Sequence, residues 1–222
     1  MKKEKELEKK YHEVHPDTTN QRALRIIKGT ATFEDRFVPD HGDLIKLISA
    51  LRSMGCIIVF VTGVWDLWHI GHGNYLQKGK DEGAKLYPNA DHVIMVVGVD
   101  SDDFTRFRKG PNRPIVPEDE RCQVLGHIRS VDVITMQYEA DQLFLVVDHD
   151  VRIISESTKD LPNLEEMQRQ CAHIVNLPPQ AETSTTARIR RLSLDGAASV
   201  LLKIEEGLKA TLQEVHNELA KK

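Results

Sequence analysis

One stretch constrains the fold more than any other: an apolar run followed at once by a glycine and two closely spaced histidines. The run Ile57-Ile58-Val59-Phe60 is rich in β-branched residues and leads into Val61-Thr62-Gly63, which predicts a buried parallel strand that breaks at the glycine. Helical spacing resumes near Ile70, so His69 and His72 lie where a strand turns into a helix. Backbone N–H groups and the helix dipole favour phosphate at such a turn, which predicts a phosphate site at one edge of an open α/β sheet.

The residues of this turn suit a ligand. Gly63 allows the backbone to approach a bound group closely, and Gly71 keeps the start of the helix uncrowded. The imidazoles of His69 and His72 add donors for phosphate oxygens. Two other interpretations stay open: a metal site, which would need a third and usually a fourth ligand that no nearby Cys or His supplies, and a purely structural role as helix caps.

The alternation of strands and helices continues along the chain. Helices are expected from Ile70 towards Gly83, from Pro117, at Asp141–Val147 and at Leu164–Cys171. Further strands are expected at His92–Val99, Val131–Ile134, Val151–Ile154 and His173–Leu177. A strand, helix and strand in succession form a right-handed crossover. Five such strands predict an α/β protein with a Rossmann-like, doubly wound, parallel five-stranded sheet.

Helical extensions flank this sheet. Residues 1–54 are expected to be an N-terminal extension, residues 55–193 the α/β domain and residues 194–222 a C-terminal amphipathic helix. Residues 1–18 are expected to form a solvated helix or a frayed tail, and residues 21–28 a helix or a strand. Residues 41–54 are expected to form a helix that ends before Gly55 and packs on the outside or edge of the sheet. The last helix carries an apolar stripe, which either packs on its own domain or forms a homodimer: Leu201, Ile204, Leu208, Leu212, Val215 and Leu219.

Composition narrows the possible partners. The 222 residues suit one compact domain with extensions, and a net charge of -4 argues against a general nucleic-acid or membrane-surface binder. The three cysteines have no C-x-x-C spacing, which favours a reducing compartment. With no apolar run long enough for a membrane helix or a signal peptide, we expect a soluble cytoplasmic protein that binds neither nucleic acid nor membrane.

Three separated motifs resemble one family. The run from Gly63 to His72 is similar to the G-x-F-D-x-x-H-x-G-H (HIGH) motif of the cytidylyltransferase-like nucleotidyltransferase superfamily, with Trp65 where Phe or Tyr is usual. Residues 108–114 with Glu120-Arg121 resemble the K-G-x-x-R-P…E-x-R region of heptose-phosphate nucleotidyltransferases and ethanolamine-phosphate cytidylyltransferases, and residues 184–189 resemble S-T-T-x-x-I. A His-Ile-Gly-His run also occurs in class I aminoacyl-tRNA synthetases, but their Lys-Met-Ser-Lys-Ser loop is missing.

The resemblance implies transfer of NMP from CTP or ATP to a small phosphorylated metabolite, such as a sugar, polyol or amino-alcohol phosphate, with release of pyrophosphate. Mg²⁺ would accompany the NTP, held by phosphates and water and not by a dedicated protein site. Catalytic roles would fall to His69, His72, Lys109 and Thr185. Acceptor binding would fall to Asp66, Arg113 and Arg121. Nucleotide binding would involve Thr62, Gly63, Val64, Trp65, Gly71, His72, Ser184, Thr185 and Thr186.

Several assignments stay open. Residues 105–114 read as a loop with four positive charges, of which Arg108 and Arg113 are either site residues or solvated charges. Trp65 is either a core residue or a stacking surface. Where many family members carry a Gly-rich turn, residues 155–160 read Ser-Glu-Ser-Thr-Lys-Asp, which leaves the base and the acceptor undecided. A non-catalytic nucleotide sensor is the alternative function, although it would need affinity and not a full set of transition-state donors.

Overall fold

The computed structural model describes residues 18–156 and 171–181, and single positions from 169 to 209. The chain divides into two compact units, Met1–Glu182 and Thr183–Lys222. Some predicted features fall on segments outside the described residues, namely 1–17, 157–160, most of Leu164–Cys171, and Ser184–Thr186. In the second unit the described residues, which begin at 189, are helical, and the exposed apolar ones among them are Leu194, Leu201, Leu202 and Ile204.

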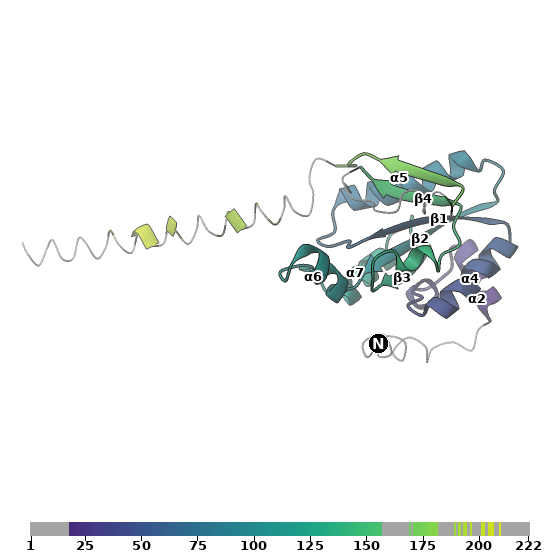
Figure 1. The fold of residues 1–222 in the computed structure, drawn as a ribbon, viewed down its shortest axis with the longest axis horizontal. Coiled ribbons are helices and arrows are strands. Elements are labelled where there is room, and N and C mark those ends of the chain that lie inside the picture. The colour runs from purple at the N-terminus through teal and green to yellow at the C-terminus, as the bar shows by residue number, and fades with distance from the viewer. Residues whose placement is uncertain are drawn as a thin grey trace, which may run out of the picture. The chain divides into compact units, whose positions relative to one another are not determined.

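Five parallel strands form the sheet of the first unit, in the order β3-β2-β1-β4-β5 (Figure 1). Their bounds are β1 Cys56–Gly63, β2 His92–Asp100, β3 Val133–Gln137, β4 Val151–Ser155 and β5 His173–Leu177. The strand order reverses between β1 and β4, which confirms the doubly wound, Rossmann-like α/β fold. The third strand begins two residues later than its expected start at Val131.

The pairing between the two central strands is short. β1 and β4 are joined only through the pairs Val59–Val151 and Phe60–Arg152. Beyond these pairs β1 continues beside β2 as far as Gly63, and β4 continues beside β5 as far as Ser155. The two strands therefore leave their shared ladder at the point where the strand order reverses, which is where open α/β sheets bind ligands.

The helices resolve one open segment and differ from expectation in others. Their bounds are α2 Thr19–Ile27, α3 Phe33–Arg36, α4 His41–Ser53, α5 Ile70–Leu86, α6 Asp102–Lys109 and α7 Glu118–Gly126. The undecided segment 21–28 is helical as far as Ile27, where α2 ends. Half of the expected loop 105–114 is helical, because Ser101 caps α6 and the helix ends only at Gly110, whose φ is 94°. The helix expected at Asp141–Val147 is a 3-10 turn, Gln142–Phe144, because Asp141 begins it in a left-handed conformation.

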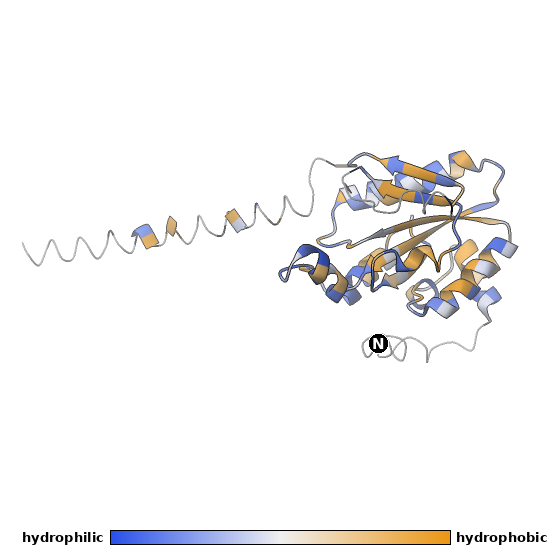
Figure 2. Cartoon of the chain, in the orientation of Figure 1, coloured by the Kyte–Doolittle hydropathy of each residue, from blue (hydrophilic) through white to orange (hydrophobic). Residues whose placement is uncertain are grey.

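Helices cover both faces of the sheet. On one face α2 and α4 pack against Ile58, Phe60 and Ile94 of the central strands. On the other face α5 contacts β1 and β2, around Val59 and Met95, and α7 contacts β2 and β3. The strands are accordingly apolar over most of their length (Figure 2). Helix α4 therefore lies on a face of the sheet and not at an edge. Within the described part of the chain, no helix combines the length and apolar character needed to cross a membrane.

Candidate functional site

The two histidines of the HIGH-like motif meet at the start of α5. His69 is the N-cap residue of this helix, and its Nδ1 accepts a hydrogen bond of 3.1 Å from the backbone N–H of Gly71. The proton of the neutral ring is therefore on Nε2, which makes that nitrogen a donor. The ring of His72 stacks on that of His69, with 3.9 Å between centroids and 28° between planes. A Cβ atom at Gly71 would lie 2.8 Å from the His69 ring, so only glycine leaves room for this arrangement.

Trp65 supports this pair from the core. Its side chain is buried, and its indole Nε1 donates to the carbonyl oxygen of Gly98 at 3.0 Å. Its ring meets that of His72 edge to face, 5.6 Å between centroids. A Cβ atom at Gly63 would lie 3.1 Å from the indole, so this glycine makes room for Trp65. The side chain of Trp65 therefore positions His72, and stacking on a base does not fit its burial.

Asp66 ties the turn after β1 to the loop after α6. Its carboxylate is 1% exposed and accepts a hydrogen bond of 2.9 Å from Nε of Arg113. It also accepts from the backbone N–H groups of Ile115 and Val116, at 3.1 and 2.9 Å. The structure therefore brings Asp66 and Arg113 together, and Arg113 is not an ordinary solvated loop charge.

Arg121 also joins the turn after β1 to the loop after α6. It is 1% exposed, and its Nε donates to the carbonyl oxygen of Val116 at 2.9 Å. One terminal nitrogen donates to the carbonyl oxygen of Val64 and the other to Asp102 at 2.8 Å. All three guanidinium nitrogens are thus used inside the protein. These bonds let Arg121 position the two segments, and its contact with the acceptor stays a prediction.

Positive charge gathers at the end of α6. Nη1 of Arg108 donates to the buried carboxylate of Asp100 at 3.0 Å, and burial raises the pKa of Asp100. Lys109 is an exposed residue, yet desolvation of its ammonium group, then the nearby Arg113, lower its pKa. The carboxylates of Asp100 and Asp66 act on it in the opposite direction. Lys109 therefore shares the electrostatic environment of Asp66 and Arg113.

Sequence reasoning missed one residue at this edge of the sheet. Arg152, in the middle of β4, donates from Nη2 to the hydroxyl of Thr62 at 3.0 Å. Its guanidinium carbon lies over the rings of Phe60 and Phe144, 4.2 Å from each centroid, and these two rings meet edge to face. The available signal was a charge inside the apolar run Val151-Arg152-Ile153-Ile154. Thr62, a predicted nucleotide-binding residue, is thus in contact with a buried cation.

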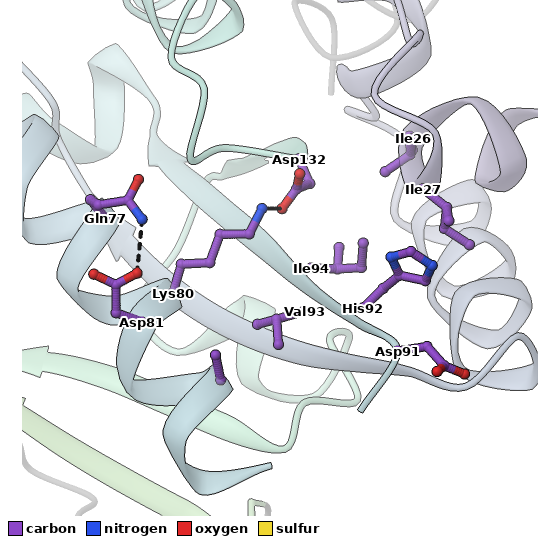
Figure 3. A pocket seen from close by; sticks show the side chains of 11 residues that line it. Ile26, Ile27, Gln77, Lys80, Asp81, Asp91, His92, Val93, Ile94 and Asp132 are labelled. Atoms are coloured by element: carbon purple, nitrogen blue, oxygen red, sulfur yellow. Dashed lines mark hydrogen bonds and ion pairs between the residues drawn. The ribbon is translucent and has the colours of Figure 1, made fainter. Parts of the chain in front are cut away.

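Two cavities lie at the opposite edge, near the amino ends of the strands. One, of about 360 Å³, is lined by residues of α5 and β2, with the ion pair of Lys80 and Asp132 in its wall at 2.5 Å (Figure 3). The other, of about 410 Å³, has Arg36 and Arg129 among its lining residues. Among the described residues that line them there is none from the three motifs. These cavities are therefore separate from the candidate site.

Several known proteins are similar to this chain. A family model described as Cytidylyltransferase-like matches residues 60–191. Among relatives, the bifunctional protein HldE of a Nitratiruptor species is 30% identical over 162 residues, 71% of this chain and 32% of the relative. The HldE protein of Helicobacter pylori is 39% identical over 119 residues, 54% of this chain and 24% of the relative.

The chain thus spans a third or less of the length of these curated relatives. A solved lipopolysaccharide core biosynthesis protein from Thermoplasma volcanium is 29% identical, with a TM-score of 0.44, over 55% of this chain and 95% of that one.

Proposed function

Because the chain belongs to the cytidylyltransferase-like family, we propose that it is a nucleotidyltransferase that moves NMP from CTP or ATP to the phosphate of a small metabolite. The observation that carries this proposal is the stacked pair of His69 and His72 at the N-terminus of α5. Imidazole donors and the free N–H groups of a helix start form a site for a triphosphate. The site lies at the carboxyl end of β1, next to the reversal of strand order.

The proposed reaction requires positive charges and hydrogen-bond donors at the site. An oxygen of the acceptor phosphate attacks the α-phosphorus of the NTP in line, the bond from that phosphorus to the oxygen bridging to the β-phosphate breaks, and pyrophosphate leaves. Two highly charged groups must come together, so stabilisation of negative charge provides most of the catalysis. In our proposal Nε2 of His69 donates to the triphosphate, and His72, stacked on it, supports the charge that develops at the α-phosphorus.

Lys109 and Arg113 are proposed to meet the acceptor phosphate. Asp66 fixes Arg113 through its Nε, and the neighbouring N–H groups of Ile115 and Val116 bind the same carboxylate. A guanidinium held this way can neutralise a phosphate without losing much freedom on binding, and the ammonium group of Lys109 adds positive charge beside it. Contacts of Ser184, Thr185 and Thr186 with the β- and γ-phosphates rest on the sequence resemblance alone.

Mg²⁺ is proposed to arrive with the NTP, as its counter-ion. In the described part of the chain no three His, Cys, Asp or Glu side chains come together, and Asp66 and Asp100 are each bound to a guanidinium. These residues do not fit a dedicated metal cage. They fit a cation held mainly by phosphate oxygens and water, for which this chain supplies the surrounding donors.

The first experiment identifies the substrates. Pyrophosphate release is measured with ATP, CTP, GTP or UTP and magnesium, against sugar, polyol and amino-alcohol phosphates. We propose a sugar phosphate as the foremost acceptor class, because residues 108–121 resemble the corresponding region of heptose-phosphate nucleotidyltransferases. Release that depends on one NTP and one acceptor supports the proposal and determines both specificities. NTP binding without release across the panel favours the non-catalytic sensor.

A histidine variant then tests the mechanism. With His72→Ala we expect kcat to fall by about two orders of magnitude or more, the usual effect of losing a donor to the transition state. His92→Ala is the matched control, because His92 is exposed at the opposite edge of the sheet and should leave kcat unchanged. Unchanged turnover in His72→Ala would contradict the catalytic assignment of this residue.

A further inference from the structure

Arg152 is a buried cation with few partners. It is 5% exposed, and among the described residues its side chain makes one hydrogen bond, from Nη2 to the neutral hydroxyl of Thr62. Nε and Nη1 are also buried and reach no hydrogen-bond acceptor in the part of the chain that the structure describes. The other buried arginine, Arg121, is in contact with a carboxylate, that of Asp102. Arg152 therefore stands apart in having a charge that the described protein does not compensate by a direct ion pair.

The contacts around Arg152 offset only part of the unfavourable free energy of burying its charge. The rings of Phe60 and Phe144, whose centroids are each 4.2 Å from the guanidinium carbon, provide cation–π attraction. Burial still lowers the pKa of Arg152 to about 10, and Tyr75, Cys171, Asp141 and Asp100 oppose this only through charge interactions and not through hydrogen bonds. A buried charge without a partner is strongly unfavourable, and removing such a group for an apolar one often stabilises a protein. Its presence is explained if a ligand supplies the missing negative charge.

Arg152 also points towards the place where a ligand would lie. Its backbone pairs with Phe60, but its guanidinium reaches Thr62, two residues closer to the carboxyl end of β1. Beyond the Phe60–Arg152 pair, β1 and β4 no longer share a ladder, and in Figure 1 the two strands lie side by side in the middle of the sheet. The cation therefore lies at the reversal of strand order, with Gly63 and the turn that bears His69 following Thr62 directly.

We propose that Arg152 is a binding residue for a phosphate group at this reversal point, to which its Nε and Nη1 donate. Guanidinium groups are well matched to phosphate in charge and donor geometry. The phosphate belongs either to the nucleotide or to the acceptor, and this choice alone rests on the proposed function. This role would explain why a charged residue interrupts a strand whose neighbouring residues, Val151, Ile153 and Ile154, are all aliphatic.

The test compares Arg152→Met with Arg36→Met. Arg36 is a suitable control because it is half-buried, donates to the carbonyl oxygens of Gly126, Ile128 and Val131, and lies at the other edge of the sheet. Binding of ATP, CTP, pyrophosphate, glucose 1-phosphate and glycerol 3-phosphate is measured one at a time by calorimetry, and thermal unfolding of the free protein is recorded. Arg152→Lys is added as a variant that keeps the charge.

We expect Arg152→Met to keep or raise the Tm of the free protein and to weaken phosphate binding by about tenfold or more, the usual effect of a lost charge-assisted hydrogen bond. Arg36→Met should lower the Tm and leave affinity unchanged. Weaker binding of ATP, CTP and pyrophosphate identifies the nucleotide as the source, and weaker binding of the sugar or glycerol phosphate identifies the acceptor. Arg152→Lys should recover part of the affinity.

The inference would be overturned if Arg152→Met bound every probe as tightly as wild type. If Arg152→Met does not fold, the same criterion applies to Arg152→Lys. A wild-type protein that binds none of the probes would overturn it as well. Failure of the proposed function looks different. Phosphate binding that depends on Arg152, with no pyrophosphate release in wild type, leaves the inference standing and contradicts the enzyme.

Discussion

At the scale of single residues, His149 links the buried core to pH. It is 3% exposed, lies 5.1 Å from the ring centroid of Phe60, and donates from Nδ1 to the carbonyl oxygen of Val147 at 2.6 Å. The pKa of His149 is lowered to about 4, mainly by burial and also by the charge of Arg152, while the hydrogen bond to Val147 and the charges of Asp148 and Asp150 oppose the shift. His149 is therefore neutral in the folded protein at pH values where an unfolded histidine is charged.

His149 should make the protein acid-sensitive. The unfolded state takes up the proton as pH falls below 6.5 and the folded state only near 4, so stability is lost across this window, by about 3 kcal/mol in total. His149→Asn keeps a donor for Val147 and should remove this slope, whereas His92→Asn, at an exposed position, should not. Urea unfolding between pH 7 and pH 4 checks it, and equal slopes in wild type and His149→Asn would contradict it. Asp100 and Asp132, whose pKa values burial raises, have the opposite pH trend but are common to all variants.

Asp66 provides the second prediction at this scale. Its substitution by Asn leaves the Arg113 guanidinium, 15% exposed, without its carboxylate. We expect a loss of stability of about 3 kcal/mol, since breaking a buried pair leaves a charge uncompensated. Asp103→Asn breaks an exposed ion pair with Arg106 and should cost less than about 1 kcal/mol. Denaturant unfolding measures both, and equal losses in the two variants would show that the Asp66 contacts contribute little.

At the scale of elements, helix α5 packs very closely on the sheet. A Cβ atom at Gly83 would lie 2.4 Å from Cγ2 of Val59, whereas one at Gly73 would meet nothing closer than 3.8 Å. Gly83→Ala should therefore destabilise the protein by about 1–3 kcal/mol through overpacking. Gly73→Ala, in the same helix, should stabilise it by up to about 1 kcal/mol through helix propensity. Thermal unfolding of the two variants should show opposite shifts in Tm, and shifts of one sign would refute the packing argument.

The elements were predictable where their hydrophobic pattern is uniform. β1 and β2 are apolar over most of their length because both faces are covered, and their positions are confirmed. β3 was misplaced because it contains the buried polar residues Thr135 and Gln137, while the apolar Val131 lies before it. The second half of α6 differs from expectation because its residues Thr105–Lys109 run directly into the Gly- and Pro-containing loop that follows, and so share its loop pattern.

The site was predictable only where it is local. His69, Gly71 and His72 lie within four residues, so their spacing on a strand-to-helix turn determines their meeting. The contact of Arg121 with Val64 joins residues 57 positions apart, and Arg152 reaches Thr62 across 90 positions. Such contacts depend on how distant strands and loops meet, so charge and motif position alone could not reveal that Arg121 is buried or that Arg152 belongs to this edge.

At the scale of the whole molecule, we propose a homodimer through the C-terminal stripe. Leu201 and Ile204 of this stripe are 65% and 53% exposed in the single chain, and Leu208 and Leu212 lie outside the described residues. Changing Leu208 and Leu212 to Glu should dissociate the dimer, because charge on an apolar seam opposes association. Lys209→Gln, which removes only an exposed pair with Glu205, is the control. Light scattering gives the solution mass, and a mass unchanged by the double variant would refute the proposal.

The segment from Val38 to His41, which leads into α4, covers one side of the sheet and so limits how two copies of this sheet could combine. The N–H of Val38 donates to the carbonyl oxygen of Ile134 at 2.8 Å, and Nε2 of His41 donates to that of Met136 at 2.9 Å. The outer side of β3 is thus already occupied by the chain itself, and among the described strands only β5 has an unshared edge. Strand addition between two molecules can therefore happen once, edge to like edge, and then stops. Misassembly through the sheet would produce a closed pair and not a growing ribbon.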